Sequence, residues 1–472
     1  MQVKQGAFLI ALVLAGFSQN PVPWCLSVVA AWIWLNRFLK PGQHPVWFLA
    51  LLIPFIEIIT SLIYVELEGL TLNEGFGNGG RTAYVYSIVA FMLFMGGVLW
   101  GTRRRDGLQV VAEVEQRLLD LPMQKLVIAH VFFHGLSAVT QMLFNQGSSL
   151  FQLVLHFGKF HLVFLYLIFW KYSLQRKHKL LVWGLFAVNL ALRLGEFFAE
   201  WKELIFLLFY TGLVTVHAFD ARWLRRMAIV GIAGVALLFT WQAVKMDYRN
   251  YLNGGTRSQQ VVVGFNSALT KFAELSGEYW TGPSNDQTQE EVFQSTMQRL
   301  GYLEFFALTV ERVPERVPFQ QGALMSQNLT FALVPRFLNP EKGIKNDQWK
   351  VEEFAGVEIA DNASFSLGRY AEWYVDYGGG MLLCGLIAGL AAVWIVRLIC
   401  RKGLSRSALI DPIFTVLVLQ NFCSYQSDEI VVYGQTFWAI VVYVTIGRPL
   451  MVHFLRTSSG NLNALDSERM AL

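Results

Sequence analysis

Long apolar runs constrain this chain more than any other feature. Stretches of about 20 mainly apolar residues recur from the N-terminus to about residue 447. A helix of that length rises about 30 Å, which is the thickness of the hydrocarbon core of a bilayer. Only 15% of the 472 residues are charged, against about 25% in soluble domains. The sequence therefore predicts an all-α polytopic membrane protein.

About twelve transmembrane helices are expected, and basic residues between them indicate their orientation. Lys and Arg gather in every second connection, as in Arg103, Arg104 and Arg105. The positive-inside rule places these connections and both termini in the cytoplasm. No small-x-small cleavage site follows the first apolar run, so we expect that run to be retained. The predicted segments are 5–18, 22–36, 45–65, 83–101, 126–145, 159–174, 180–197, 203–219, 226–244, 379–398, 411–423 and 431–447.

This topology divides the chain into four parts. Helices one to nine occupy 1–244, a large outward-facing loop domain 245–378, helices ten to twelve 379–447, and a cytoplasmic tail 448–472. The loop has an excess of Asp and Glu, and the rest of the chain an excess of Lys and Arg. The net charge of +4 thus reflects membrane orientation, and no nucleic acid partner is expected.

The large loop is predicted to be partly helical. Residues 289–314 follow a helical period that Pro314 ends, and residues 333–354 predict an irregular chain. A long irregular connection is often a lid or a binding loop.

Several familiar catalytic signatures are absent from the sequence. It has no GxxxxGK[ST] phosphate loop, no GxGxxG after a strand and no HExxH. His130 and His134 share a helix face, but no third ligand is evident, so we interpret them as core or cavity histidines. We expect neither a metal nor a cofactor. An enzyme of this kind needs a substrate that arrives already activated, carried by the membrane.

Cations near the predicted outer surface are candidates for binding a diphosphate. Arg193 lies on an apolar helix, where a charge is costly unless it is paired or useful, and Lys202 follows it. Arg249 and Arg257 lie in "VKMDYRNYLNGGTR" (244–257). One interpretation of these residues is a membrane-interface anchor. The other is a set of charges aimed at a lipid diphosphate, for which the bidentate geometry of Arg is suited.

The stretch "SFSLGRYAEWYVDYGGG" (364–380) is a third candidate. Arg369, Glu372 and Asp376 recur at spacings of three and four, which places them on one helical face. Gly378, Gly379 and Gly380 then permit a tight turn or the close approach of another helix. The glycan-binding candidates are Tyr370, Trp373 and Tyr374.

An aromatic belt with a salt-bridged entry helix would account for this stretch as well. The predicted topology, however, brings Arg193, Arg249 and Arg369 to one depth from three loops, which favours a functional site. Asp428 and Glu429, in the last outer connection, are expected to be solvated or paired with a loop cation.

The many apolar segments, the large outer loop and "SFSLGRYAEWYVDYGGGMLLCGLIAGL" resemble the Wzy-type O-antigen and exopolysaccharide repeat-unit polymerases. "LVPRFLNPEKGIKNDQW" resembles the loop of that family, and Arg369 and Gly380 match its Arg-x10-Gly pattern. The topology resemblance covers nearly the whole chain, whereas the resemblance in sequence covers about 330–390.

The resemblance implies a bacterial inner-membrane glycosyltransferase. Its substrate would be an undecaprenyl diphosphate-linked oligosaccharide, polymerised at the periplasmic face without a metal. A flippase and a chain-length regulator would be its partners beside the lipid bilayer. Arg193, Arg249 and Arg369 would stabilise the leaving diphosphate. Glu372 would be the base that takes the acceptor proton, with Asp376 as the second choice.

Two alternatives remain open. The related O-antigen ligases are described as using a histidine in the large outer loop, and residues 245–378 contain none. A transporter of lipid-linked glycans would place such charges along a path near the membrane midplane, whereas here they cluster at one face.

Overall fold

The structure, a computed structural model, is entirely helical in the part of the chain that it describes. That part comprises residues 2–102, 111–143, 156–194, 202–216, 219–253, 265–281, 286–334, 348–358, 366–400 and 407–455. The α-helices of its first half are α1 (Gln2–Leu14), α2 (Pro21–Phe38), α3 (Val46–Leu67), α4 (Leu72–Phe76), α5 (Gly80–Gly101), α6 (Val111–Asp120), α7 (Met123–Leu143), α9 (Phe160–Gln175), α10 (Lys179–Leu194), α11 (Lys202–Val214) and α12 (Ala221–Asn253).

The second half continues in the same way. Its α-helices are α13 (Phe265–Thr281), α14 (Asp286–Gly301), α15 (Glu304–Arg312), α16 (Ala323–Leu333), α17 (Gln348–Ala355), α18 (Arg369–Tyr377), α19 (Met381–Ile399), α20 (Asp411–Phe422), α21 (Glu429–Val442) and α22 (Arg448–Leu455). The prediction of an all-α protein is confirmed for the described residues.

Each of the twelve predicted apolar segments coincides with a helix of the structure. Within the described residues, five helical stretches are long and apolar enough to cross a membrane, fewer than the twelve crossings expected: Val46–Leu67, Gly80–Gly101, Ala221–Leu252, Arg369–Ile399 and Glu429–Leu455. Shorter apolar helices accompany them at Phe8–Phe17 and Glu203–Val214. The fold is therefore compatible with a multi-pass membrane protein.

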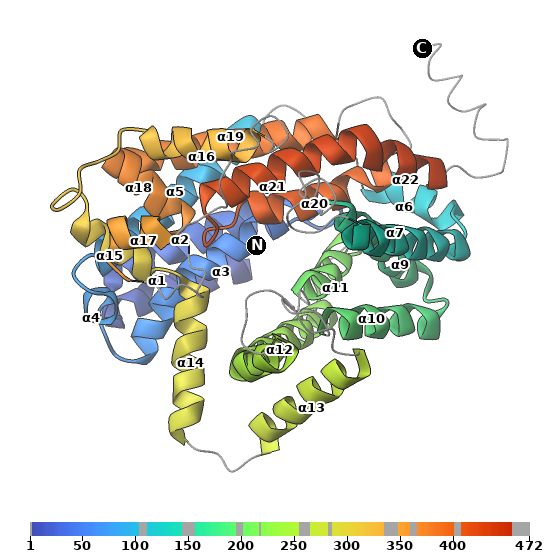
Figure 1. Cartoon of the computed structure of the whole chain (residues 1–472), viewed down its shortest axis with the longest axis horizontal. Coiled ribbons are helices and arrows are strands. Elements are labelled where there is room, and N and C mark those ends of the chain that lie inside the picture. Colours follow the sequence, from blue (N-terminus) through green and yellow to red (C-terminus); the bar gives the residue numbers. More distant parts are fainter. Residues whose placement is uncertain are drawn as a thin grey trace.

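Glycines bring α5 and α19 into close contact, side by side along the body of the molecule (Figure 1). A Cβ atom added at Gly389 would lie 2.2 Å from the Phe94 carbonyl oxygen, and one at Gly97 would lie 2.4 Å from that of Leu386. Small residues at helix contacts let two backbones approach where lipid offers no hydrophobic gain. This pair positions the N-terminal end of α19, which directly follows the helix that carries the candidate site.

The helix α12 is longer than the predicted ninth segment, which ended at residue 244. No glycine or proline lies between Gly234 and Gly254, so nothing in the sequence stops the helix before Asn253. Its 33 residues span about 50 Å, well beyond the hydrocarbon core. Lys245 and Arg249, which the sequence suggested were in a loop, lie on the last turns of this helix.

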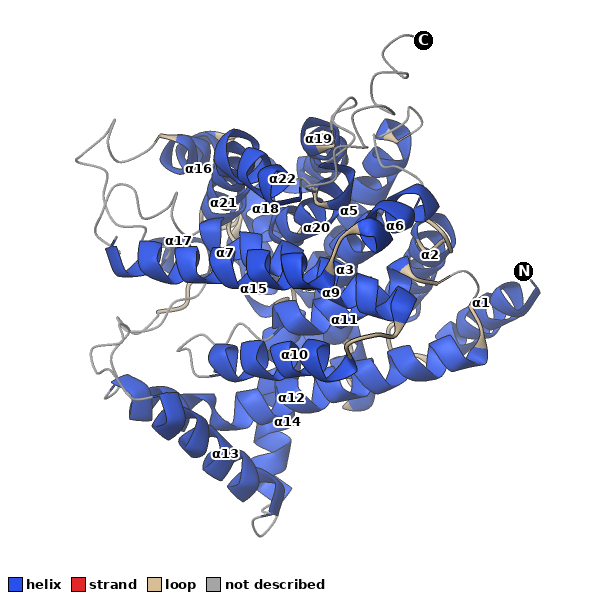
Figure 2. Ribbon diagram, turned by 90° about the vertical axis from the view of Figure 1, so that its right-hand side faces the viewer, coloured by secondary structure: helices blue, strands red, loops and turns tan. Residues whose placement is uncertain are grey.

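Helices α10, α12 and α13 form a layer apart from the body that contains α3, α5, α19 and α21 (Figures 1 and 2). A small apolar cluster joins the layer, in which Trp241 and Tyr248 of α12 pack against Leu194 and Phe272. Helix α14 contacts both α12 and α3, and so connects the layer to the body.

Helix α14 begins within the large loop, whose helical content the sequence predicted only in part. The expected helix over 289–314 is present as two helices, α14 and α15, with Tyr302 at a φ of 47° between them. The prediction of irregular chain over 333–354 is wrong at its end, because α17 begins at Gln348. Residues 335–347 lie outside the described part of the chain.

Candidate functional site

Helix α18 carries the predicted triplet Arg369, Glu372 and Asp376 on one face, as the sequence spacing indicated. All three side chains are buried, with exposed fractions of 2%, 1% and 2%. The helix ends at a short 3-10 turn, Gly378–Gly380, where Gly378 has a φ of 53°. This positive φ favours glycine and separates α18 from α19.

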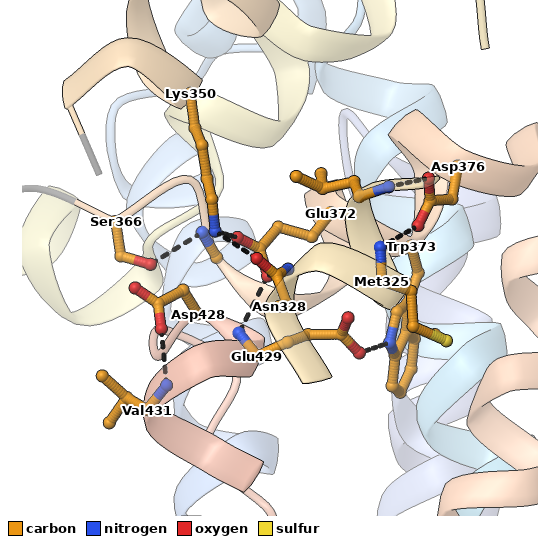
Figure 3. A network of polar contacts seen from close by, with 12 residues as sticks. Met325, Asn328, Lys350, Ser366, Glu372, Trp373, Asp376, Asp428, Glu429 and Val431 are labelled. Atoms are coloured by element: carbon orange, nitrogen blue, oxygen red, sulfur yellow. Dashed lines mark hydrogen bonds and ion pairs between the residues drawn. The ribbon is translucent and has the colours of Figure 1, made fainter. Parts of the chain in front are cut away.

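Glu372 lies at the centre of a buried polar network (Figure 3). Its Oε1 atom pairs with Lys350 Nζ of α17 at 2.5 Å. Its Oε2 atom accepts hydrogen bonds from Asn328 Nδ2 at 3.3 Å and from the Glu429 backbone N–H at 2.8 Å. Lys350 also donates to Asn328 Oδ1 at 3.0 Å. The network joins α16, α17, α18 and α21, and it occupies both oxygens of the carboxylate.

Asp376 caps the start of α16. Its carboxylate accepts hydrogen bonds from the backbone N–H groups of Gly322, Leu324 and Met325, at 3.2, 3.1 and 2.7 Å. These groups belong to the first turn of the helix, which has no intrahelical acceptors for them. Asp376 thus accepts from backbone donors that would otherwise be buried without an acceptor, which is energetically costly.

Arg369 is enclosed by aromatic rings. Its guanidinium carbon lies 4.6 Å from the Trp373 ring centroid and 4.8 Å from that of Phe422, and Nη1 donates to the Phe422 carbonyl oxygen at 2.5 Å. The positive charge also acts on Glu429 of α21. Cation–π contacts and a carboxylate offset the cost of burying the charge.

Asp428 and Glu429 are buried, with exposed fractions of 1% each, so solvation, one of the two expectations for them, is wrong. The other expectation, a nearby cation, applies to Glu429, on which the charge of Arg369 acts. Asp428 Oδ1 caps α21 by accepting from the Val431 N–H at 2.8 Å. Glu429 Oε1 accepts from Trp373 Nε1 and from Tyr433 Oη. The short connection before α21 folds inward because these carboxylates find donors inside the protein.

The rings of Tyr370, Trp373 and Tyr374, predicted to bind glycan, are buried in the protein interior. Tyr370 packs edge-on against Tyr425, and Tyr374 lies against Phe306. Stacking on a sugar requires one free ring face. In this structure the rings instead pack α18 against its neighbours.

Three cations gather where α12 meets α14. Lys245, Arg249 and Arg299 lie close enough that their positive charges repel one another. Lys245 Nζ donates to Gln242 Oε1 at 2.6 Å, and the Arg249 guanidinium lies 5.9 Å from the Trp241 ring centroid. Burial lowers the pKa of the Arg299 guanidinium, and the nearby Tyr302 hydroxyl partly offsets this lowering. Positive charges held together in this way can attract an anion.

Gln426 connects this cation cluster to the network around Glu372. Its Nε2 atom donates to the backbone oxygens of Arg299, at 3.1 Å, and of Leu300, at 3.2 Å. Gln426 lies in the connection that leads directly to Glu429. The two parts of the site therefore share one short segment of chain.

The remaining predicted diphosphate ligands lie elsewhere or outside the described residues. Arg193, at the end of α10, lies 3.5 Å from the Glu203 carboxylate. Arg369 packs on rings of α18, α20 and α21, whereas Arg249 lies near Arg299 of α14. Arg257 lies outside the described residues, and the structure does not describe the side chain of Lys202.

Sequence reasoning missed Lys350, Asn328 and Arg299. Lys350 and Asn328 lie 22 and 44 residues from Glu372 along the chain, and nothing in their local sequence marks them as its partners. Arg299 was recognisable only as a cation in an acidic loop. Among the described residues, no group of three or more His, Cys, Asp and Glu side chains could hold a metal ion.

A family model matches the central part of this chain. The model of a domain of unknown function (DUF8712) matches residues 82–399, which is more than half of the chain. No curated protein and no solved structure matches it.

Proposed function

The chain belongs to the DUF8712 family, whose function is unknown, and we propose that it polymerises undecaprenyl diphosphate-linked oligosaccharide repeat units. The proposal includes the finer topology: twelve crossings, both termini in the cytoplasm, and a reaction at the periplasmic face of the bacterial inner membrane. The resemblance of residues 330–390 to Wzy-type polymerases supports it.

The cation cluster of Lys245, Arg249 and Arg299 carries this proposal. Lys245 and Arg249 lie on the last turns of a helix that is longer than the hydrocarbon core is thick, so the proposed crossing of this helix would bring the cluster to the depth of a lipid headgroup. A lipid diphosphate carries several negative charges on a compact group. Two guanidinium groups and one ammonium group offer the donors and the charge that such a group requires.

The reaction would be a glycosyl transfer. A hydroxyl of the acceptor sugar attacks the anomeric carbon of the donor glycan, and the bond from that carbon to the diphosphate oxygen breaks. The bonding electron pair leaves with the diphosphate, and the hydroxyl proton passes to a base. Cations held in place before the reaction stabilise the negative charge that grows on the diphosphate.

We assign a positioning role to Arg369, Glu372 and Asp376 within this mechanism. A general base must face the proton that it removes, and both Glu372 oxygens already accept hydrogen bonds inside the protein. Asp376 is likewise engaged with α16. Their network fixes the connection from which Gln426 holds the backbone at Arg299.

Purified protein in detergent, supplied with the undecaprenyl diphosphate-linked repeat unit of its own host, tests the proposal. We expect a ladder of lengthened glycans on a gel. Arg249→Gln and Arg299→Gln should each reduce the rate by at least about tenfold, because a charge-assisted hydrogen bond contributes about 1.5–3 kcal/mol. Arg316→Gln, which removes an exposed arginine of the same loop, is the matched control and should leave the ladder intact.

Other outcomes separate the alternatives. Movement of labelled lipid-linked glycan across liposome membranes without a ladder would identify a transporter. Transfer of one finished chain to a lipid A core acceptor would identify a ligase. A ladder that persists in both arginine variants would refute the role of the cation cluster.

A further inference from the structure

Three histidines gather between α7, α9 and α10, away from the site described above. The ring centroids of His134 and His161 lie 4.8 Å apart, and those of His130 and His161 lie 5.5 Å apart. The sequence indicated His130 and His134 as a pair without a third member. The structure adds His161, the second residue of α9, which lies close to both of them.

The polar atoms of this histidine cluster (His130, His134 and His161) are unequally satisfied. Both ring nitrogens of His130 have hydrogen-bond partners. Nδ1 lies 3.0 Å from the His161 carbonyl oxygen, and Nε2 lies 3.3 Å from Asn189 Nδ2. His161, with an exposed fraction of 2%, faces the Gly158 backbone, but neither of its ring nitrogens has a hydrogen-bond partner among the described residues. The same holds for Nδ1 of His134. Buried polar atoms of this kind are costly unless a ligand or a water molecule satisfies them.

Arg193 adds a positive charge to the cluster. It follows Asn189 by four residues on α10, which places the two on one face of the helix. Its charge acts on His161 and on His134. Glu203 lies 3.5 Å from Arg193 Nη2, longer than the about 2.7–2.9 Å of a tight charge-assisted hydrogen bond.

The neighbouring arginine favours an anion over a metal ion. A divalent cation bound by the imidazoles would be repelled by the guanidinium group, and no metal-binding geometry is present among the described side chains. A neutral imidazole offers one N–H donor, and a guanidinium group offers five. Phosphate oxygens accept from both kinds of donor, and arginine binds them in a bidentate manner.

We propose that His134, His161 and Arg193 form a binding site for a phosphate group. The guanidinium group of Arg193 would then contact both the phosphate and the Glu203 carboxylate. This site uses side chains different from those of Lys245, Arg249 and Arg299. It includes Arg193, which the resemblance assigned to the lipid diphosphate, but it shares no side chain with the cation cluster, so the two sites can be tested separately. The phosphate group could be a free ion or the headgroup of an isoprenyl lipid, since both present the same oxygens.

Isothermal titration of the purified full-length protein in detergent tests the site, with pyrophosphate and farnesyl diphosphate as probes. The titrations use the wild type and a background that carries Arg249→Gln and Arg299→Gln, so that the cation cluster cannot supply the binding. We expect both proteins to bind at least one probe. Tighter binding of farnesyl diphosphate would identify a lipid headgroup as the ligand, and equal binding of both probes would identify a free phosphate group.

Variants of the histidine cluster decide the outcome. Arg193→Gln and His161→Phe should each weaken binding by at least about tenfold in the double-glutamine background, since a hydrogen bond to a charged group contributes about 1.5–3 kcal/mol. Arg176→Gln, at the opposite end of α9, is the matched control and should bind like its parent. Gel filtration of each variant verifies folding.

Three results would overturn the proposal. The first is a folded double-glutamine protein that binds neither probe. The second is unchanged affinity in Arg193→Gln together with unchanged affinity in His161→Phe. The third is zinc binding that depends on His134 and His161 while neither probe binds.

Discussion

Replacing Lys350 by methionine removes the only side-chain cation that the described structure pairs directly with Glu372. The two groups meet at 2.5 Å, and their side chains are 1% and 0% exposed. Methionine keeps the apolar length of the side chain but leaves Glu372 with only the donors from Asn328 and the Glu429 backbone. Removing one partner of a buried pair costs about 3–5 kcal/mol, because the remaining charge is buried without compensation.

Thermal unfolding in detergent measures this cost. We expect Lys350→Met to lower the unfolding temperature by on the order of 5 °C. Combining Lys350→Met with Glu372→Gln removes both charges. The free energy of unfolding of this double variant should be at least about 2 kcal/mol higher than the two single losses, added together, would give. Lys271→Met breaks a pair whose side chains are 32% and 55% exposed and is the matched control. It should cost at most about 1 kcal/mol.

Two results would refute this reasoning. Lys350→Met could unfold at the same temperature as Lys271→Met, which would mean that the pair is not buried in solution. Alternatively, the effects of Lys350→Met and Glu372→Gln could simply add, which would mean that the two groups do not interact.

Three further predictions concern other parts of the fold. Asp376→Ala should lower the free energy of unfolding by about 1–3 kcal/mol in thermal unfolding, because three backbone donors lose their acceptor. Asp376→Asn keeps a side-chain acceptor and should lose at most half as much; equal losses in the two variants would contradict the cap. Gly389→Val should destabilise the protein by more than about 2 kcal/mol, whereas Gly96→Val, with nothing within 4 Å, should cost less than half as much in the same assay. Hydrogen bonds from Thr71 lower the pKa of Glu74 below its ordinary value of 4.5, so their contribution is present above pH 4.5 and is lost as the pH falls through the folded-state pKa. Protection factors of the α4 amides, calculated against the intrinsic exchange rate at each pH, should therefore fall in acid, and protection factors that stay constant down to pH 2 would argue against this capping box.

The positions of the helices were largely predictable from the sequence, because long apolar runs mark them without any knowledge of their neighbours. The end of α12 was not predicted, since Lys245, Asp247 and Arg249 suggested a loop. Charged residues do not by themselves end a helix, and after Gly234 the sequence has no glycine or proline before residue 254, so the helix continues to Asn253.

The candidate site was predictable only within one helix. The spacing of Arg369, Glu372 and Asp376 fixes their common face, because the helical period is local. Their partners depend on how distant helices pack, and Lys350 has no local signal that links it to Glu372. Burial of Asp428 and Glu429 also depends on that packing, so their place between two apolar segments suggested solvent instead.

The connection between α20 and α21 fastens several helices at once. The backbone N–H of Tyr425 donates to Glu57 of α3 at 2.8 Å, and its carbonyl oxygen accepts from the N–H of Arg369 at 3.2 Å. One residue later, Gln426 holds the end of α14. A displacement of α14 would therefore pull on α3 and α18 together, so the middle of α3, the start of α18 and the end of α14 should move as a single mechanical unit.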